Sequence, residues 1–393
     1  PVDKGISMAI FTDKELKARQ ERLQKGLAKR KVDVAFIHSA DNVYYTTGIP
    51  LLSEWGRPMW AVFDVPGKVR VIGAAIEKEN MEENARADEV LPYADDTNVV
   101  QASLRLVGSV IARRKSKPKR IGIEREIMSL GLHDALQAQF PGAEFVEIGD
   151  IITDLRIIKS AEELGILQLG ATIAKLGANA FLEALDDNAT ELTVAGHAVN
   201  EMNKALGALY PGGGTSTYAY AQFARHTLTP HLHPTGQRLR RGDLVALNVF
   251  PVIWGYCMEL ERTFVFGEPT RKQQKPLDAV NEAFDAAKAY VGPGVAMNDV
   301  DNLTRKMLKE AGFGRYIRHG TGHAHGIMIG SASREEPGEL RYYNKNRLRA
   351  GMANSVEPGV YIPEIGGFRH SDVMFITDKG AVCVTDFPRD ILY

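Results

Sequence analysis

The sequence has few cysteines, no long apolar run and almost no net charge. Cys257 and Cys383 are the only cysteines among 393 residues, which is too few for a disulfide framework and fits a reducing compartment. No stretch approaches the ~18 apolar residues of a membrane span, and the start, PVDKGISMAIFTDKE, lacks the apolar core of a signal peptide. A formal net charge of -1 provides no basic field for nucleic acid. We therefore expect a cytoplasmic globular protein without nucleic-acid or membrane partners.

The chain is long enough for about two domains of ~150 residues each. Residues 1–155 alternate strand and helix patterns, as a mostly parallel sheet with crossover helices would. Residues 156–393 combine long helices with antiparallel strand pairs, which predicts an α+β domain. Near this boundary Ser160 is a candidate N-cap for a helix that reaches about Leu185.

The segment from Gly242 to Thr263 predicts two apolar strands joined by a short turn, with Glu259 and Glu261 near its end. Alternate residues of a strand point to one face. Two acids on one face of an apolar hairpin are costly unless a cation binds there. The pattern leaves open whether this cation is a metal ion, an Arg or Lys side chain, or a cationic substrate.

Three further segments carry residues capable of chemistry. They are PHLHP at 230–234, GTGHAHG at 320–326, and SVEPG with GGFRHSD at 355–372. Taken singly, each has a simpler interpretation as a turn, a surface histidine or a solvated loop. Their occurrence together, after the acidic hairpin, favours a functional site.

Together these segments resemble the creatinase and Xaa-Pro aminopeptidase family over nearly the whole chain. The segments that carry the resemblance are IIKSAEE, GDLVALNVFPVIWGYCMELERT, GTGHAHG, SVEPGVYIP and GGFRHSD. The resemblance implies an α+β protein, in which an N-terminal α/β creatinase-type domain precedes a C-terminal pita-bread catalytic domain.

The metallopeptidases of this family use five metal ligands: two Asp eleven residues apart, a His and two Glu. The resemblance places these ligands, in order, on Asn248, Glu259, His323, Glu357 and Ser371. Two hard dications held close together need several anionic oxygens, and Asn248 and Ser371 supply no charge. We therefore predict no dinuclear site, no catalytic metal and no other cofactor.

The resemblance is closest to the metal-independent creatinase branch, whose reaction is hydrolysis of creatine to sarcosine and urea. The catalytic His of that branch matches His231, and its other active-site His matches His323. Its two guanidinium-binding glutamates match Glu261 and Glu357.

Three further matches concern the substrate's carboxylate. The arginine that binds it matches Arg334. A second arginine and an aromatic residue, which reach in from the neighbouring subunit, match Arg57 and Trp55. The resemblance therefore implies a homodimer with shared active sites.

Some presumed pocket residues depart from creatinase. Glu259 stands where creatinase has Ala, Ser371 where it has His, Cys257 where it has Tyr, and Trp55 where it has Phe. These departures favour a related small substrate of more cationic character over creatine itself.

These matches predict a metal-independent hydrolase that cleaves a carbon–nitrogen bond, other than a peptide bond, in a small zwitterion. Glu261 and Glu357 are predicted to bind the cationic end of the substrate. His231 would act as general base and then as general acid, because its ordinary pKa of ~6.5 suits both roles. His323 would be a second proton or hydrogen-bond partner.

Other interpretations stay open from the sequence. One is an Xaa-Pro metallopeptidase with a reduced, single-metal site built from Glu259, His323, Glu357 and His231. A second is a non-catalytic pita-bread binding protein, against which the retained set of polar residues argues. A third is a lyase acting on a sulfonium or betaine zwitterion, against which the lost metal ligands argue.

Overall fold

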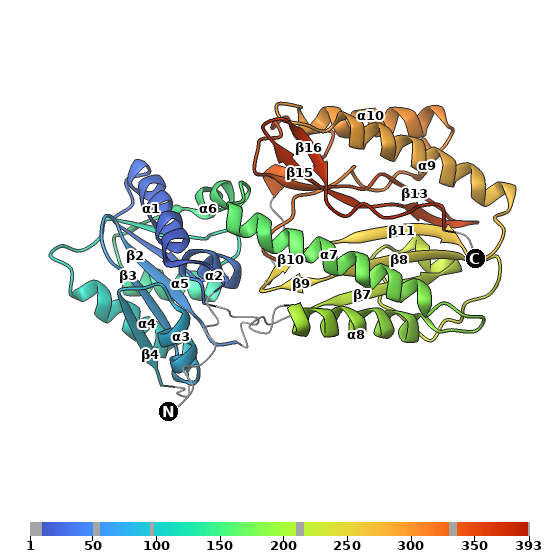
Figure 1. Ribbon diagram of the computed structural model, residues 1–393. Coiled ribbons are helices and arrows are strands. Elements are labelled where there is room, and N and C mark those ends of the chain that lie inside the picture. Colours follow the sequence, from blue (N-terminus) through green and yellow to red (C-terminus); the bar gives the residue numbers. More distant parts are fainter. Residues whose placement is uncertain (1–9, 50–55, 95–97, 210–215, 330–335, 392–393) are drawn as a thin grey trace. The chain divides into compact units, whose positions relative to one another are not determined.

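The computed structural model describes residues 10–49, 56–94, 98–209, 216–329 and 336–391. It forms two compact units (Figure 1): Pro1–Arg156 with Ile327–Ser333, and Ile157–Gly326 with Arg334–Tyr393. Within the described ranges, no helix is both long and apolar enough to cross a membrane.

The first unit is built on a six-stranded sheet of order β4-β3-β2-β1-β5-β6. The strands are β1 (Val34–Ile37), β2 (Trp60–Asp64), β3 (Val69–Ala74), β4 (Glu89–Tyr93), β5 (Arg120–Ile123) and β6 (Glu144–Glu147). The β1–β5, β5–β6 and β3–β4 pairs are parallel, as predicted, but β1–β2 and β2–β3 are antiparallel. The connection from β2 to β3, residues 65–68, is so short that only antiparallel neighbours can be joined by it.

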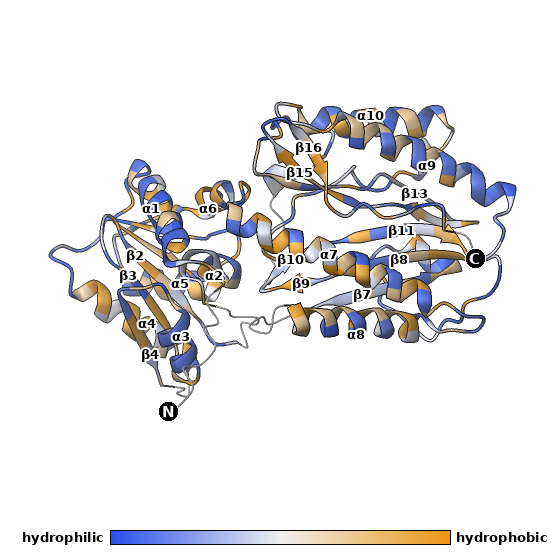
Figure 2. Ribbon diagram, viewed as in Figure 1, coloured by the Kyte–Doolittle hydropathy of each residue, from blue (hydrophilic) through white to orange (hydrophobic). Residues whose placement is uncertain are grey.

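Helices cover this sheet and supply its core. They are α1 (Asp13–Lys29), α2 (Ala40–Thr47), α3 (Lys78–Asn84), α4 (Val99–Ala112), α5 (Leu130–Gln139) and α6 (Gly149–Arg156), with the 3-10 turn η1 (Ala75–Glu77). Val107 and Val110 of α4 belong to one buried cluster with Trp60 and Ile72 of the sheet. Figure 2 shows the strands of this sheet as largely hydrophobic and α1 as largely hydrophilic. The sequence pattern predicts helices over 12–29, 99–113 and 129–139, which correspond to α1, α4 and α5, but it gives no prediction for the short helices α2, α3 and α6.

The second unit contains the long helices α7 (Ala161–Glu183), α8 (Glu191–Leu209), α9 (Arg271–Tyr290) and α10 (Met297–Glu310), and the 3-10 turns η2 (Ala224–Leu228), η3 (Gly314–Tyr316) and η4 (Glu336–Gly338). The predicted cap of α7 is confirmed, since Ser160 and Glu163 form a reciprocal capping box. Helix α7 packs on α8 and on the sheet, whereas α9 and α10 lie over the C-terminal strands (Figure 1).

The strands of the second unit form two three-stranded sheets, β11-β8-β7 and β12-β15-β16, and two two-stranded pairs, β9-β10 and β13-β14. Their bounds are β7 (Tyr218–Phe223), β8 (Leu244–Phe250), β9 (Val252–Ile253), β10 (Tyr256–Cys257), β11 (Leu260–Val265), β12 (Ala353–Val356), β13 (Gly359–Ile362), β14 (Gly366–Arg369), β15 (Asp372–Thr377) and β16 (Gly380–Cys383).

The predicted acidic hairpin is more interrupted than its sequence indicates. Trp254 and Gly255, at φ +50° and +75°, form the two-residue turn between β9 and β10. The strand pattern then stops at Met258 and Glu259 before β11 begins. Gly170 of α7 lies so close to this break that a Cβ atom would come within 2.9 Å of the Met258 Cβ atom. The break therefore separates Glu259 from the ladder in which the rest of the hairpin takes part.

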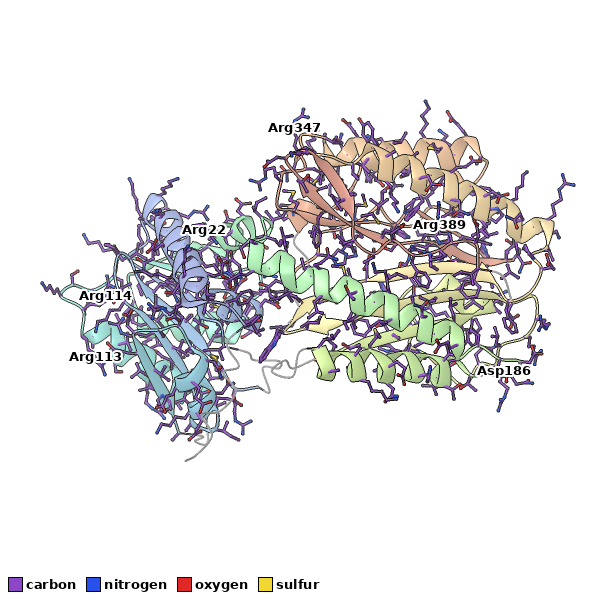
Figure 3. The ribbon with its side chains drawn as sticks, viewed as in Figure 1. Arg22, Arg113, Arg114, Asp186, Arg347 and Arg389 are labelled. Carbon is purple, nitrogen blue, oxygen red and sulfur yellow. The ribbon has the colours of Figure 1, made fainter. Side chains whose placement is uncertain are left out.

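The C-terminal segment is tied to α9 by polar contacts. The Arg389 guanidinium lies 2.8 Å from the Asp285 carboxylate and donates to the Asn281 side chain at 3.1 Å. Figure 3 shows Arg389 among the side chains of the second unit, and Arg22, Arg113 and Arg114 among those of the first. These contacts hold the chain that follows β16 against the helical layer.

Candidate functional site

Three buried glutamates of the second unit lie near one another. Glu259 precedes β11, Glu261 lies within it and Glu357 follows β12, and they are 5%, 3% and 7% exposed. The Ser371 hydroxyl donates to Glu259 Oε1 at 2.6 Å. The Arg369 guanidinium is paired with Glu261 at 2.5 Å and lies 3.9 Å from Glu357. The Arg369 guanidinium thus balances part of the charge that these three carboxylates supply.

Two histidines face the same carboxylates. His323 Nε2 lies 3.4 Å from Glu259 Oε2 and 3.6 Å from Glu357 Oε1. His325 Nε2 lies 3.6 Å from the other Glu259 oxygen. The ligand atoms of Glu259, His323 and His325 all lie within 4.8 Å of one another, so these residues could hold a metal ion.

The backbone between these residues is fixed by short contacts. His323 and Ser355 exchange hydrogen bonds, with Ser355 N donating to the His323 carbonyl at 2.8 Å and His323 N donating to Ser355 Oγ at 3.0 Å. Glu357 N donates to the Thr321 carbonyl at 2.6 Å. Gly322 must be glycine here, because a Cβ atom would lie 2.0 Å from the Ser355 carbonyl oxygen. The GTGH segment is therefore held tightly against the strand that leads to Glu357.

The carboxylates differ in their affinity for protons. Burial opposes ionisation of Glu259, but the nearby imidazoles of His323 and His325 outweigh it and hold the pKa of Glu259 well below its ordinary value. Burial raises the pKa of Glu261 to about 8; the Arg369 guanidinium opposes this rise, and the two neighbouring carboxylates add to it. Glu259 is therefore ionised more readily than Glu261.

Arg369 also borders a narrow cavity. It donates to Asn248 Oδ1 at 3.4 Å and to the Tyr361 hydroxyl at 3.5 Å. Burial raises the pKa of Tyr361 to about 12, so its hydroxyl keeps its proton at neutral pH. The cavity has a volume of about 10 Å³ and is lined by Gln222, Thr227, Pro230, Ala246, Asn248, Thr263, Tyr361, Gly367 and Arg369.

A second cluster of potential metal ligands differs from the first. It consists of Asp372, Cys383 and Asp386. Asp372 is already paired with Arg262 at 2.8 Å and with Lys288 at 2.7 Å. Because protein cations already neutralise Asp372, this cluster favours structural ion pairing over metal binding.

The structure brings many of the predicted site residues together. These are Glu259, Glu261, His323, Glu357 and Ser371. Cys257 is buried at the end of β10, and its carbonyl oxygen lies 3.3 Å from His325 Nδ1. His231 is exposed in the loop that follows η2, and Arg57 is half-buried in the first unit. Trp55 and Arg334 lie outside the described residues.

Sequence reasoning missed two residues of this site, Arg369 and His325, although both lie in motifs that it singled out. Each lies two positions from a residue that was predicted, Arg369 from Ser371 and His325 from His323. The spacing of alternate residues on extended backbone could have placed each pair on one face.

Comparisons with known proteins agree with this arrangement. A model of the metallopeptidase family M24 matches residues 166–378, and a model of the creatinase/prolidase N-terminal domain matches residues 19–158. The Xaa-Pro dipeptidase of Pyrococcus furiosus is 29% identical over 385 residues, covering 96% of this chain and 100% of that protein. A creatinase from a Bacillus species is 28% identical over 383 residues, and the match covers 96% of this chain and 92% of the creatinase.

Among solved structures, the prolidase from Pyrococcus horikoshii superposes with a TM-score of 0.82 at 25% identity. The match covers 95% of this chain and 100% of that one. The predicted fold, a creatinase-type N-terminal domain followed by a pita-bread domain, is confirmed.

The predicted activity is wrong. A metal-independent, creatinase-like hydrolase of non-peptide carbon–nitrogen bonds is contradicted by relatives named Xaa-Pro dipeptidase and by structural neighbours named prolidase. The error was physical: the uncharged Asn248 and Ser371 argue against two metal ions, but they do not remove the donors that one ion needs. The chain belongs to the metallopeptidase family M24.

Proposed function

We propose that this protein is a metal-dependent peptidase of the Xaa-Pro dipeptidase type, with residues 156–393 as its catalytic domain. The observation that carries the proposal is the position of His323 Nε2, 3.4 Å from Glu259 and 3.6 Å from Glu357. The names of the relatives supply the reaction class.

The donor set fits a divalent metal ion. The carbonyl of Ala324, which can only accept, lies 2.9 Å from His323 Nδ1, so Nδ1 donates to it. His323 Nε2 faces two carboxylate oxygens, and a metal ion among these three atoms would be bound by all of them. Glu259 and His323 would hold the ion, with Glu357 beside His323. A bound ion would polarise the scissile carbonyl and activate water.

The remaining residues would orient this site and manage protons. The hydroxyl of Ser371 fixes one oxygen of Glu259 at 2.6 Å, which leaves the other oxygen directed at His323. The pair of Glu261 and Arg369 supplies a fixed dipole beside the cavity that Arg369 lines. His231 follows Pro230, which lines that cavity, and it would donate a proton to the leaving nitrogen of proline.

The substrate we propose is a dipeptide zwitterion with a C-terminal proline. Its ammonium group would bind among the glutamates, and Arg334 would hold its carboxylate. Arg57 of the partner subunit and Trp55 of the partner subunit would complete the carboxylate site in a homodimer.

A single assay series tests this function. The purified protein is incubated with Ala-Pro, Ala-Ala or creatine, each with added Mn²⁺, Co²⁺ or Zn²⁺ and each with excess chelator. We expect hydrolysis of Ala-Pro that depends on metal and exceeds hydrolysis of the other two compounds. Undiminished turnover in chelator, or no peptide hydrolysis with any metal, would overturn the proposal.

A further inference from the structure

His325 lies in the acidic site, although the resemblance does not place a metal ligand at this position. The segment that carries it is extended: His325 N donates to the Ala353 carbonyl at 2.8 Å, and Ala324 bridges to Asn354. Alternate side chains of extended backbone share a face. The rings of His323 and His325 accordingly lie 4.9 Å apart, centroid to centroid, with an interplanar angle of 36°.

The two ring nitrogens of His325 have different surroundings. Its Nδ1 lies 3.3 Å from the Cys257 carbonyl oxygen, which can only accept, so Nδ1 donates to it. Its Nε2 faces Glu259 Oε1 at 3.6 Å. The side chain is 3% exposed, and among the described residues this nitrogen has no hydrogen-bond partner.

A buried ring nitrogen without a hydrogen-bond partner, beside a carboxylate and a second imidazole, is a position that a metal ion would satisfy. We propose that His325 is a metal ligand, and that Glu259, His323 and His325 form a mononuclear site in place of a dinuclear one. The proposal rests on the proposed function for the metal dependence, but it concerns binding and is tested without catalysis.

Charge favours one ion over two. Glu259, Glu261 and Glu357 can carry at most three negative charges, and Arg369 supplies one positive charge at 2.5 Å from Glu261. Two divalent ions would therefore leave at least two positive charges in excess among these buried groups. Asn248 is already engaged, since its amide nitrogen donates to the Tyr220 carbonyl at 3.1 Å.

The ligand types indicate which metals would bind. Two imidazoles and one carboxylate suit Zn²⁺, Co²⁺ and Fe²⁺, whereas Mg²⁺ and Ca²⁺ prefer oxygen ligands alone. His325 thus replaces, with nitrogen, a ligand that the chain lacks at Asn248 or Ser371.

The test measures metal binding in the full-length protein stripped with chelator and titrated with Co²⁺. The variants are His325→Ala, His325→Gln, which keeps a polar side chain of similar length, and His133→Ala as a control in the first unit. For wild type and control we expect one equivalent bound, measured by elemental analysis, with one Co²⁺ absorption spectrum. In both His325 variants the affinity for Co²⁺ should fall by more than about 100-fold. Loss of a residue that only hydrogen-bonds to a metal ligand lowers the affinity by about 10–100-fold.

Two results would overturn the proposal: two equivalents of Co²⁺ in wild type, or a folded His325→Gln protein with unchanged affinity and spectrum. Chelator-sensitive Ala-Pro hydrolysis together with unchanged binding by His325→Gln would defeat this inference and leave the proposed function standing. Binding of one equivalent of Co²⁺ that depends on His325, without any peptide hydrolysis, would support this inference and contradict the proposed function.

Discussion

Two buried carboxylates, one in each unit, show how the same residue type serves different ends. Glu124, 1% exposed, accepts hydrogen bonds from the backbone N–H groups of His38 and Ser39, at 2.6 and 3.0 Å, and from the Ser39 and Asn42 side chains, at 2.7 and 2.6 Å. Glu259, 5% exposed, accepts one short bond and otherwise faces imidazole nitrogens. A carboxylate surrounded by hydrogen-bond donors from the scaffold has a structural role, whereas one that faces two imidazoles belongs to a set of groups that could hold a metal ion.

The largest effect should follow from changing the carboxylate of the site. Glu259→Gln should lower kcat/KM for an Xaa-Pro dipeptide by about 10³-fold, because a charged metal ligand is lost. Its free energy of unfolding should also fall, because the charge that His323 and His325 favour at Glu259 is removed. Steady-state kinetics and urea unfolding measure the two quantities. Activity within tenfold of wild type would show that Glu259 is not a ligand.

Metal removal should affect the two units unequally. An ion that binds only the folded second unit stabilises it by about 4 kcal/mol at a free concentration of ~1000 Kd. Chelation should therefore lower the temperature at which the second unit unfolds and leave the first unit unchanged. Calorimetry with and without chelator, and after metal is restored, measures this shift. An identical melting profile in all three samples would contradict the proposed site.

The scaffold carboxylate should show the opposite behaviour. Glu124→Gln places an amide NH₂ group against hydrogen-bond donors and removes the charge that they solvate, so it should destabilise the first unit by about 3 kcal/mol. The kcat/KM of the folded variant should stay within about threefold of wild type. Urea unfolding and peptidase assays measure the two effects, and Glu147→Gln serves as a more exposed control. A stability equal to that of wild type would mean that these donors are solvated equally well without the charge.

The stabilising effect of Glu124 should depend on pH. Burial opposes its ionisation, but hydrogen bonds and charge from His38, followed by hydrogen bonds from Ser39, lower the pKa of Glu124 to about 2 from the ordinary 4.5. A depressed folded-state pKa stabilises the protein above the unfolded pKa, and this stability is lost as pH falls through the folded value. The shift corresponds to about 3 kcal/mol. The difference in stability between wild type and Glu124→Gln should therefore be constant above about pH 5 and shrink toward pH 2; a difference independent of pH would contradict this assignment.

The smallest effect should follow from removing the Ser371 hydroxyl, which donates to the proposed ligand Glu259. Ser371→Ala removes the 2.6 Å hydrogen bond to Glu259 and should weaken Co²⁺ binding by about tenfold, as loss of such supporting residues does. The kcat at saturating metal should be nearly unchanged. Competition titration gives the affinity, and Ser355→Ala tests a neighbouring hydroxyl that contacts backbone instead. A loss of more than about 100-fold would make Ser371 itself a ligand.

Much of the fold could be predicted because its long elements have clear periodicity. The sequence pattern predicts a strand over Asp372–Thr377, which are the bounds of β15, and Ser160 as N-cap predicts the start of α7. The short helices α2, α3 and α6 escaped prediction because seven or eight residues show too little periodicity. The antiparallel pairing of β2 with β1 and β3 was not predicted, because strand direction depends on the path of the connecting segments.

The sequence allowed us to predict which residues lie near one another, but not what they bind. Glu259, Glu261, His323 and Glu357 were expected to lie together, and they do. The role of His325 depends on which ring nitrogen faces the Cys257 carbonyl, and no sequence pattern gives that information. Counting lost ligands therefore led to a metal-free mechanism, whereas the geometry favours a cation.

The most direct test of a single-metal peptidase is the activity of metal-free protein as Co²⁺ is added in increments. The account predicts that Ala-Pro hydrolysis is absent without metal, rises in proportion to added Co²⁺ and reaches a plateau at one equivalent per chain. Hydrolysis that is undiminished in chelator would contradict the metal dependence. A plateau at two equivalents would contradict the mononuclear site.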